Sequence, residues 1–171
     1  MITTLRIAPL VFVAAVVQVT VLGGVRVLWA EPDLLLVTIV CVALAAGSVP
    51  GASAGFAGGL LVDVMTLGTL GTTSIVLTLA GYWAGRYGET TGRGRRYAAP
   101  LAAFAISILA GFSGVALHFL LGEPVAARDA LVTAVPSALL ASVLALGVSR
   151  ITGAIFEPPR GLERPRQVEL V

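Results

Sequence analysis

The chain has 171 residues, of which 57% are hydrophobic and only 12% are charged, and its mean hydropathy is +0.98. Soluble domains carry about 25% charged residues, so this composition predicts an all-α, polytopic membrane protein. The net charge of +2 is small and spread along the chain, which argues against nucleic-acid binding. At about 20 residues per crossing, the length allows at most six or seven spans and leaves no room for a soluble catalytic domain.

Long apolar runs predict a single transmembrane domain over residues 1–156 with about six helices. The first run is interpreted as a retained helix, because no A-x-A-like cleavage site is followed by a polar mature domain. Pro32 suits the start of the second helix, and "GSVPG" is expected to break the chain before the third. The predicted helices cover residues 7–25, 34–46, 52–67, 72–86, 98–121 and 130–149.

Whether the second and third predicted helices both cross the membrane fully stays open at the sequence level. The helix at 34–46 is short, and apolar runs of about 10 to 14 residues are ambiguous between spanning and re-entrant segments. Full crossing by every helix is the preferred interpretation, and a re-entrant pair joined by a turn is the alternative.

The arginines predict the orientation, because positive charges in short loops stay on the cytoplasmic side. Four arginines lie between the fourth and fifth helices and four follow the sixth, whereas the opposite loops carry only Arg26 and Arg128. Six crossings then place both termini in the cytoplasm. The Pro- and charge-rich residues 157–171 predict a disordered cytoplasmic tail. The arginine cluster could also contact anionic membrane lipids, although topology marking alone would explain it.

A row of glycines marks the third helix. Gly51, Gly55 and Gly59 recur every four residues, so they share one helix face. Such a face lets a second helix approach until the backbones touch, which matters in lipid because apolar helices gain little hydrophobic energy from each other. The row therefore predicts a helix-packing groove, filled either from within the chain or by a partner.

Asp63 continues this row inside an apolar helix, where an acid is costly. The preferred role is structural: Asp63 accepts hydrogen bonds from the free amides at the start of the next helix, near Thr72 and Thr73, or pairs with Arg26. Gly68 and Gly71 form the intervening turn. A role in ion or proton transport is the weaker alternative, because the predicted spans hold no second carboxylate.

The remaining candidates do not form a recognisable active site. Cys41 is the only cysteine and His118 the only histidine, so neither a paired-thiol site nor a histidine cluster is predicted. Ser107, Gly111 and Gly114 suggest a second close-packed helix face. With no catalytic motif, the chain is expected to be neither an enzyme nor a cofactor or metal binder.

Three segments together resemble the MreD family, small integral membrane proteins of bacterial rod-shape determination. They are "PDLLL" at 32–36, "GFAGGLLVDVMTLGTLG" at 55–71 and "LAGYWAGR" at 79–86. The family often has Ser-Gly-Gly or Ser-Gly after the acid, where this chain has "TLG" at 66–68. The matching positions are Pro32, Asp33, Gly55, Gly59, Asp63, Gly68, Leu70, Gly71, Gly81, Tyr82 and Gly85.

The resemblance implies a noncatalytic scaffold of the cell-wall elongation complex in the bacterial cytoplasmic membrane. Such a protein binds MreC and, through it, MreB, RodA and a class B penicillin-binding protein. Family members are also similar in architecture to the substrate-binding subunits of energy-coupling-factor transporters. A vitamin-type transporter subunit is therefore the alternative, although only Trp29, Asp63 and His118 could line its ligand cavity.

Overall fold

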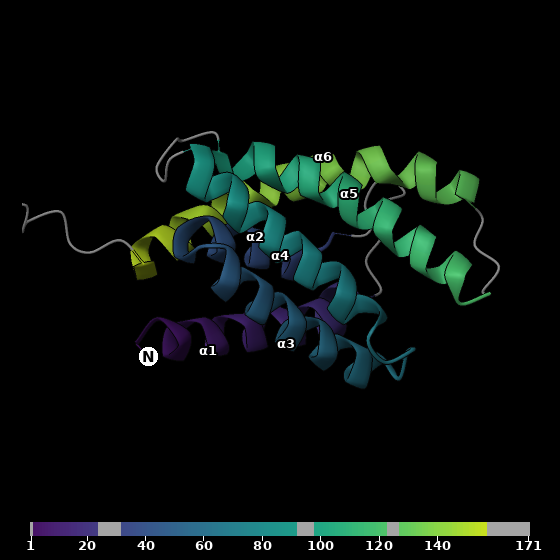
Figure 1. Cartoon of the computed structure of the whole chain (residues 1–171), viewed down its shortest axis with the longest axis horizontal. Coiled ribbons are helices and arrows are strands. Elements are labelled where there is room, and N and C mark those ends of the chain that lie inside the picture. The colour runs from purple at the N-terminus through teal and green to yellow at the C-terminus, as the bar shows by residue number, and fades with distance from the viewer. Residues whose placement is uncertain (1, 24–31, 92–97, 123–126, 157–171) are drawn as a thin grey trace, which may run out of the picture.

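A computed structural model describes residues 2–23, 32–91, 98–122 and 127–156, and these residues form helices joined by short turns (Figure 1). The elements of this part of the chain are α1 (Ile2–Val17), the π-helical turn η1 (Gln18–Leu22), α2 (Leu34–Ala46), α3 (Ser48–Thr66), α4 (Thr72–Thr91), α5 (Ala98–Leu120) and α6 (Ala127–Phe156).

Several helix ends differ from the sequence-based prediction. The bounds of α2 agree at both ends and α5 ends one residue early, but α1 begins at Ile2 and α6 runs on to Phe156. The expected break at "GSVPG" is present but confined to Gly47, whose φ is 110°, and α3 already begins at Ser48. Pro50 lies in the first turn of α3, where its missing N–H would have no helical acceptor in any case. The fourth helix also continues beyond residue 86 to Thr91.

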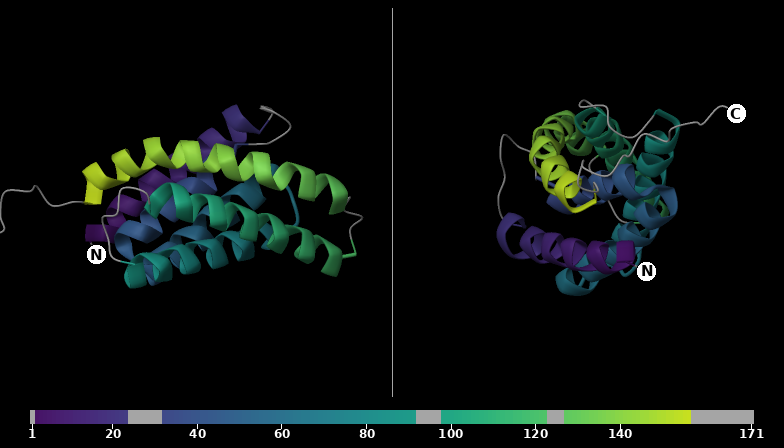
Figure 2. Two further views of the ribbon diagram at one scale, coloured as in Figure 1. Left: turned by 90° about the horizontal axis from the view of Figure 1, so that it is seen from above. Right: turned by 90° about the vertical axis from the view of Figure 1, so that its left-hand side faces the viewer.

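The helices run alternately up and down, so the beginning of α1 and the end of α6 lie at the same end of the molecule (Figures 1 and 2). A hydrogen bond joins these two ends, because Arg6 Nη1 donates to the carbonyl oxygen of Ile155 at 3.0 Å. The turn between α3 and α4 lies at the opposite end (Figure 1). The tail at 157–171, predicted to be disordered, is outside the described residues.

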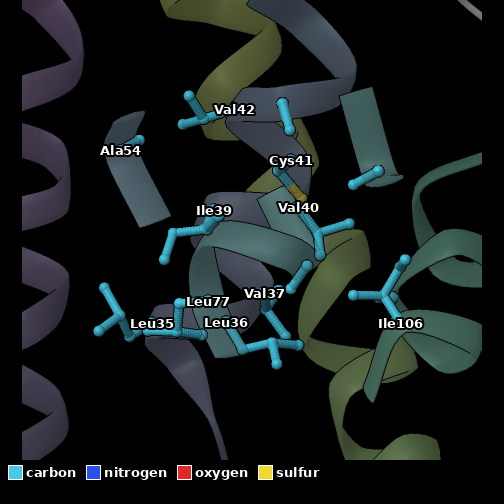
Figure 3. Close-up of a cluster of buried hydrophobic side chains, with 14 of the residues drawn as sticks. Leu35, Leu36, Val37, Ile39, Val40, Cys41, Val42, Ala54, Leu77 and Ile106 are labelled. Atoms are coloured by element: carbon cyan, nitrogen blue, oxygen red, sulfur yellow. The ribbon is translucent and has the colours of Figure 1, made fainter. Parts of the chain in front are cut away.

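The short helix α2 forms the centre of the bundle. Its side chains are buried from Leu35 to Ala43, and α1, α3, α4, α5 and α6 all contact it. Figure 3 shows this cluster, in which Leu77 of α4 and Ile106 of α5 lie around the α2 side chains. At about 1.5 Å per residue its 13 residues extend about 20 Å, less than the roughly 30 Å hydrocarbon layer. Other helices, and not lipid, therefore surround α2.

Three of the described helices contain segments long and apolar enough to cross a membrane: Ser48–Thr66, Ala98–Leu117 and Thr133–Phe156. Two further segments, Arg6–Leu22 and Leu34–Ala46, are apolar but shorter. The fold is thus an all-helical membrane domain. Six complete crossings remain an expectation from the sequence.

Candidate functional site

The glycine row of α3 packs directly on the backbone of α4. A Cβ atom added to Gly51 would lie 2.7 Å from the carbonyl oxygen of Gly81, and one added to Gly59 would lie 2.5 Å from the Cα of Ser74. At Gly55 the added atom would overlap the carbonyl group of Leu77. Real Cβ atoms essentially never come closer than 3.0 Å to such neighbours. Only glycine therefore allows these two helices their observed separation.

The glycines of α4 complete the same contact. An added Cβ at Gly81 would overlap the carbonyl group of Gly51, and one at Gly85 would overlap the backbone of Ser48. The family-motif glycines of α4 thus face the glycine row of α3. The helix that fills the groove is α4 of the same chain.

The Asp63 carboxylate stabilises one end of this helix pair through hydrogen bonds to the start of α4. Its side chain is 2% exposed, and its two carboxylate oxygens accept hydrogen bonds from the N–H groups of Gly71 at 2.8 Å and Thr73 at 3.3 Å. Amides at a helix start have no helical acceptor, and the helix dipole favours a negative charge there. This geometry agrees with the structural role expected for Asp63. The other expected partner, Arg26, lies outside the described residues.

The turn between the two helices depends on backbone conformations that favour glycine. Gly71 has a φ of 96°, a conformation that L side chains rarely adopt. The N–H of Gly68 donates to the carbonyl oxygen of Asp63 at 3.2 Å, which closes the end of α3. The only non-glycine residue with positive φ in the described chain is Leu67, at 53°. The Gly68 bond and the Asp63 carboxylate fix the turn at the start of α4.

The Glu89 carboxylate stabilises the other end of the pair through hydrogen bonds to the start of α3. Its Oε1 accepts hydrogen bonds from the backbone N–H of Ser48 at 2.8 Å and from the Ser48 hydroxyl at 2.9 Å. Its Oε2 lies 3.5 Å from Nη1 of Arg86. The bonds from the backbone and hydroxyl of Ser48 hold the pKa of Glu89 below its usual value, since they stabilise the charged form. An acid on α4 thus caps α3, as an acid on α3 caps α4.

Sequence reasoning missed Glu89, because the predicted fourth helix ends at residue 86. The available signal was topological: in an antiparallel hairpin, the last turn of one helix lies beside the first turn of the other. We call the glycine contact with its two acids, Asp63 and Glu89, the α3–α4 clasp.

A third helix start, that of α2, is capped in the same manner. Gln18, the first residue of η1, accepts a hydrogen bond from the N–H of Leu34 at 2.8 Å and donates one to the carbonyl oxygen of Pro32 at 3.2 Å. Asp33 accepts a hydrogen bond from the N–H of Leu36 at 2.9 Å. Pro32 and Asp33 therefore serve the entry into α2. Sequence reasoning missed Gln18, although it is the only amide side chain in the first apolar run.

The second glycine face suggested by the sequence is not close-packed. An added Cβ at Gly111 or Gly114 of α5 would meet no described atom within 4 Å. The side chain of His118 lies outside the described residues. The spacing of these residues resembles that of the α3 row, but no described backbone approaches them.

Tyr82 lies on the outward side of α4, beside Trp83. The two rings meet edge to face with their centroids 5.9 Å apart, and the residues are 42% and 53% exposed. Cys41 is buried in the core, as a structural cysteine would be. In the part of the chain that the structure describes, no three His, Cys, Asp or Glu residues come together to hold a metal ion.

Comparison with known proteins gives one match. A family model described as rod shape-determining protein MreD matches residues 1–151, which include the whole clasp and most of α6. Among curated proteins and solved structures, no match to the chain was found.

Proposed function

The chain belongs to the MreD family of rod shape-determining proteins, and we propose that it acts as a noncatalytic membrane scaffold of the cell-wall elongation complex. Membership of the family supports a part in determining rod shape. In the proposal, the chain binds MreC and thereby connects MreB with RodA and a class B penicillin-binding protein. It crosses the bacterial cytoplasmic membrane six times, and both termini lie in the cytoplasm.

The clasp is the observation that best supports a scaffold. The two acids of this helix pair, the buried Asp63 and the exposed Glu89, accept hydrogen bonds from the start of the neighbouring helix. In lipid, unpaired backbone amides cost several kcal/mol each, so such caps fix how one helix lies on the next. These side chains maintain a defined shape instead of meeting a substrate. A scaffold needs a defined surface more than it needs a reactive group.

The filled groove constrains where a partner can bind. Because α4 occupies the glycine row, MreC has to contact an outward face of the bundle, and the row serves binding indirectly by fixing that face. The bond between Arg6 and Ile155 brings the two ends of the domain together, which supports an arrangement with both termini on one side.

Co-purification from native membranes tests this proposal. The full-length chain would carry an affinity tag, and the membranes would be solubilised in mild detergent before capture. We expect MreC to co-purify, and we expect MreB, RodA and the penicillin-binding protein to be lost from the captured material when MreC is absent. Failure to capture MreC with the folded wild-type chain would contradict the proposal. Saturable binding of a vitamin-type ligand, abolished in Asp63→Asn, would instead favour a transporter subunit.

A further inference from the structure

An apolar groove with a volume of about 640 Å³ lies between α1 and α3, on the side of α3 away from the clasp. This volume is within the range of sites for small organic ligands, about 300–1,000 Å³. Val11 lies at its floor, close to Gly58, where an added Cβ would be 2.9 Å from Val11 Cγ1. The groove is lined by Ile7, Ala8, Pro9, Val11 and Phe12 of α1 and by Val49, Pro50, Ser53, Ala54, Ala57 and Leu61 of α3.

The groove runs along α3 and begins at one end of the bundle. The helices α1 and α3 both start at this end (Figure 1), so Ile7 and Val49 mark its beginning. From Val49 to Leu61 the α3 helix rises about 18 Å at 1.5 Å per residue. One leaflet of the hydrocarbon layer is about 15 Å thick, half of the roughly 30 Å total. The α3 wall of the groove thus has the length of one leaflet, and therefore of a lipid acyl chain, whereas the α1 wall extends from Ile7 to Phe12.

A positive charge lies one residue before the first residue that lines the groove. Arg6 directly precedes Ile7 and is exposed, and its bond to the Ile155 carbonyl holds it at this end of the bundle. That bond uses one N–H group, whereas a guanidinium carries five. The acid at the same end, Glu89, is bonded to Ser48 and lies beside Arg86. Arg6 can therefore still bind a phosphate oxygen, for which a guanidinium is well suited.

We propose that this groove is a binding site for an anionic phospholipid, with one acyl chain between α1 and α3 and the headgroup phosphate on Arg6. Charge complementarity at one end and an apolar lining of one-leaflet length both fit this ligand. The one hydroxyl in the lining, that of Ser53, already donates to the carbonyl oxygen of Pro50 at 3.0 Å, so the groove offers no unpaired side-chain donor to a polar partner. The inference does not depend on MreC binding.

Native mass spectrometry of the purified full-length chain tests the site. The protein would be titrated with phosphatidylglycerol or with phosphatidylcholine of the same acyl chains. We expect one saturable phosphatidylglycerol molecule, bound at least about tenfold more tightly than phosphatidylcholine, a difference of about 1.4 kcal/mol. Ala57→Phe should fill the groove and abolish saturable binding of both lipids. Arg6→Gln should remove the preference for phosphatidylglycerol and leave phosphatidylcholine binding unchanged.

Matched substitutions elsewhere on the lipid-facing surface serve as controls. Ala105→Phe on α5 enlarges another exposed alanine, and Arg150→Gln removes an exposed arginine from α6. Neither should alter lipid binding, and melting temperatures would verify folding of every variant. If Ala57→Phe does not fold, Ser53→Leu blocks the same groove. Equal lipid binding by the wild type and a folded groove variant would overturn the proposal, as would an equal loss of preference in Arg150→Gln.

Discussion

Two helix hairpins of this protein carry similar rows of small residues and use them differently. In the α3–α4 hairpin, Gly51, Gly55 and Gly59 touch the backbone of the neighbouring helix. In the α5–α6 hairpin, an added Cβ at Gly111 or Gly114 would meet no described atom within 4 Å. Buried alanines provide the packing there, including Ala102, Ala103 and Ala110 of α5 and Ala138, Ala141 and Ala145 of α6.

The difference shows that small residues permit a close contact but do not specify it. The α3–α4 pair has in addition an acid at each end, and each acid binds the start of the other helix. These bonds fix the register of the two helices along each other. In lipid, where apolar burial contributes little to helix association, packing and hydrogen bonds of this kind determine which helices approach most closely.

The largest expected effect on the free energy of unfolding distinguishes the close-packed glycine face of α3 from the open glycine face of α5. In Gly55→Ala the new methyl group would overlap the Leu77 carbonyl, which cannot rotate away as a side chain can. We expect the free energy of unfolding to fall by about 3 kcal/mol, the upper end of overpacking costs. In Gly114→Ala the site is open, and the better helix propensity of alanine should raise the free energy by up to about 1 kcal/mol. Unfolding in detergent with increasing dodecyl sulfate measures the stability of both variants. Equal destabilisation of the two would show that the α3 and α5 glycine faces do not differ in packing.

A substitution of Asp63 removes the hydrogen bonds that cap α4 at one end of the clasp. Asp63→Ala leaves the N–H groups of Gly71 and Thr73 without their acceptor, so we expect a loss of about 2 kcal/mol in the free energy of unfolding. Asp63→Asn keeps one acceptor oxygen and should lose about 1 kcal/mol. Thr66→Val is the matched control, because that hydroxyl bonds only to Val62 in its own helix, and its effect should stay within about 0.5 kcal/mol. A loss in Asp63→Ala no larger than in this control would count against the cap.

The smallest expected effect is a pH dependence at the other end of the clasp. Because bonds from Ser48 lower the pKa of Glu89 in the folded state, its contribution to stability is complete above the ordinary value of 4.5. The contribution is lost as the pH falls through the lower, folded-state pKa. At neutral pH we therefore expect Glu89→Gln to melt below the wild type, and the gap in melting temperature should close as the pH falls below 4.5. A gap that stays constant over this range would show that the charge of Glu89 is unimportant.

Hydropathy and spacing predicted much of this arrangement. The apolar runs gave the helical class and both bounds of α2, and the four-residue spacing placed Gly51, Gly55 and Gly59 on one face. The cost of a carboxylate in lipid, together with the free amides at a helix start, indicated the bonds that Asp63 makes. These predictions succeeded because they rest on local geometry and on a strong local penalty.

The remaining features depend on what lies across from each residue, which one sequence does not reveal. Spacing alone could not distinguish Gly114, which faces open space, from Gly55, which faces a backbone. Ser48 falls in the predicted break and Glu89 beyond the predicted end of the fourth helix, yet the two residues bind each other and both helices include them. Both residues still lie in the terminal turns of their helices, which begin earlier and end later than the sequence pattern predicts.

The shape of cells that depend on this chain tests the central claim, a scaffold for rod shape held together by the clasp, most directly. The chromosomal gene would be depleted, and the wild type, Gly55→Ala or Gly114→Ala would be supplied at matched membrane levels. The ratio of cell length to width is the measurement. We expect rods with the wild type and Gly114→Ala, and rounded cells with Gly55→Ala or with no supplied chain. Rods that persist after depletion without any supplied chain would contradict the account.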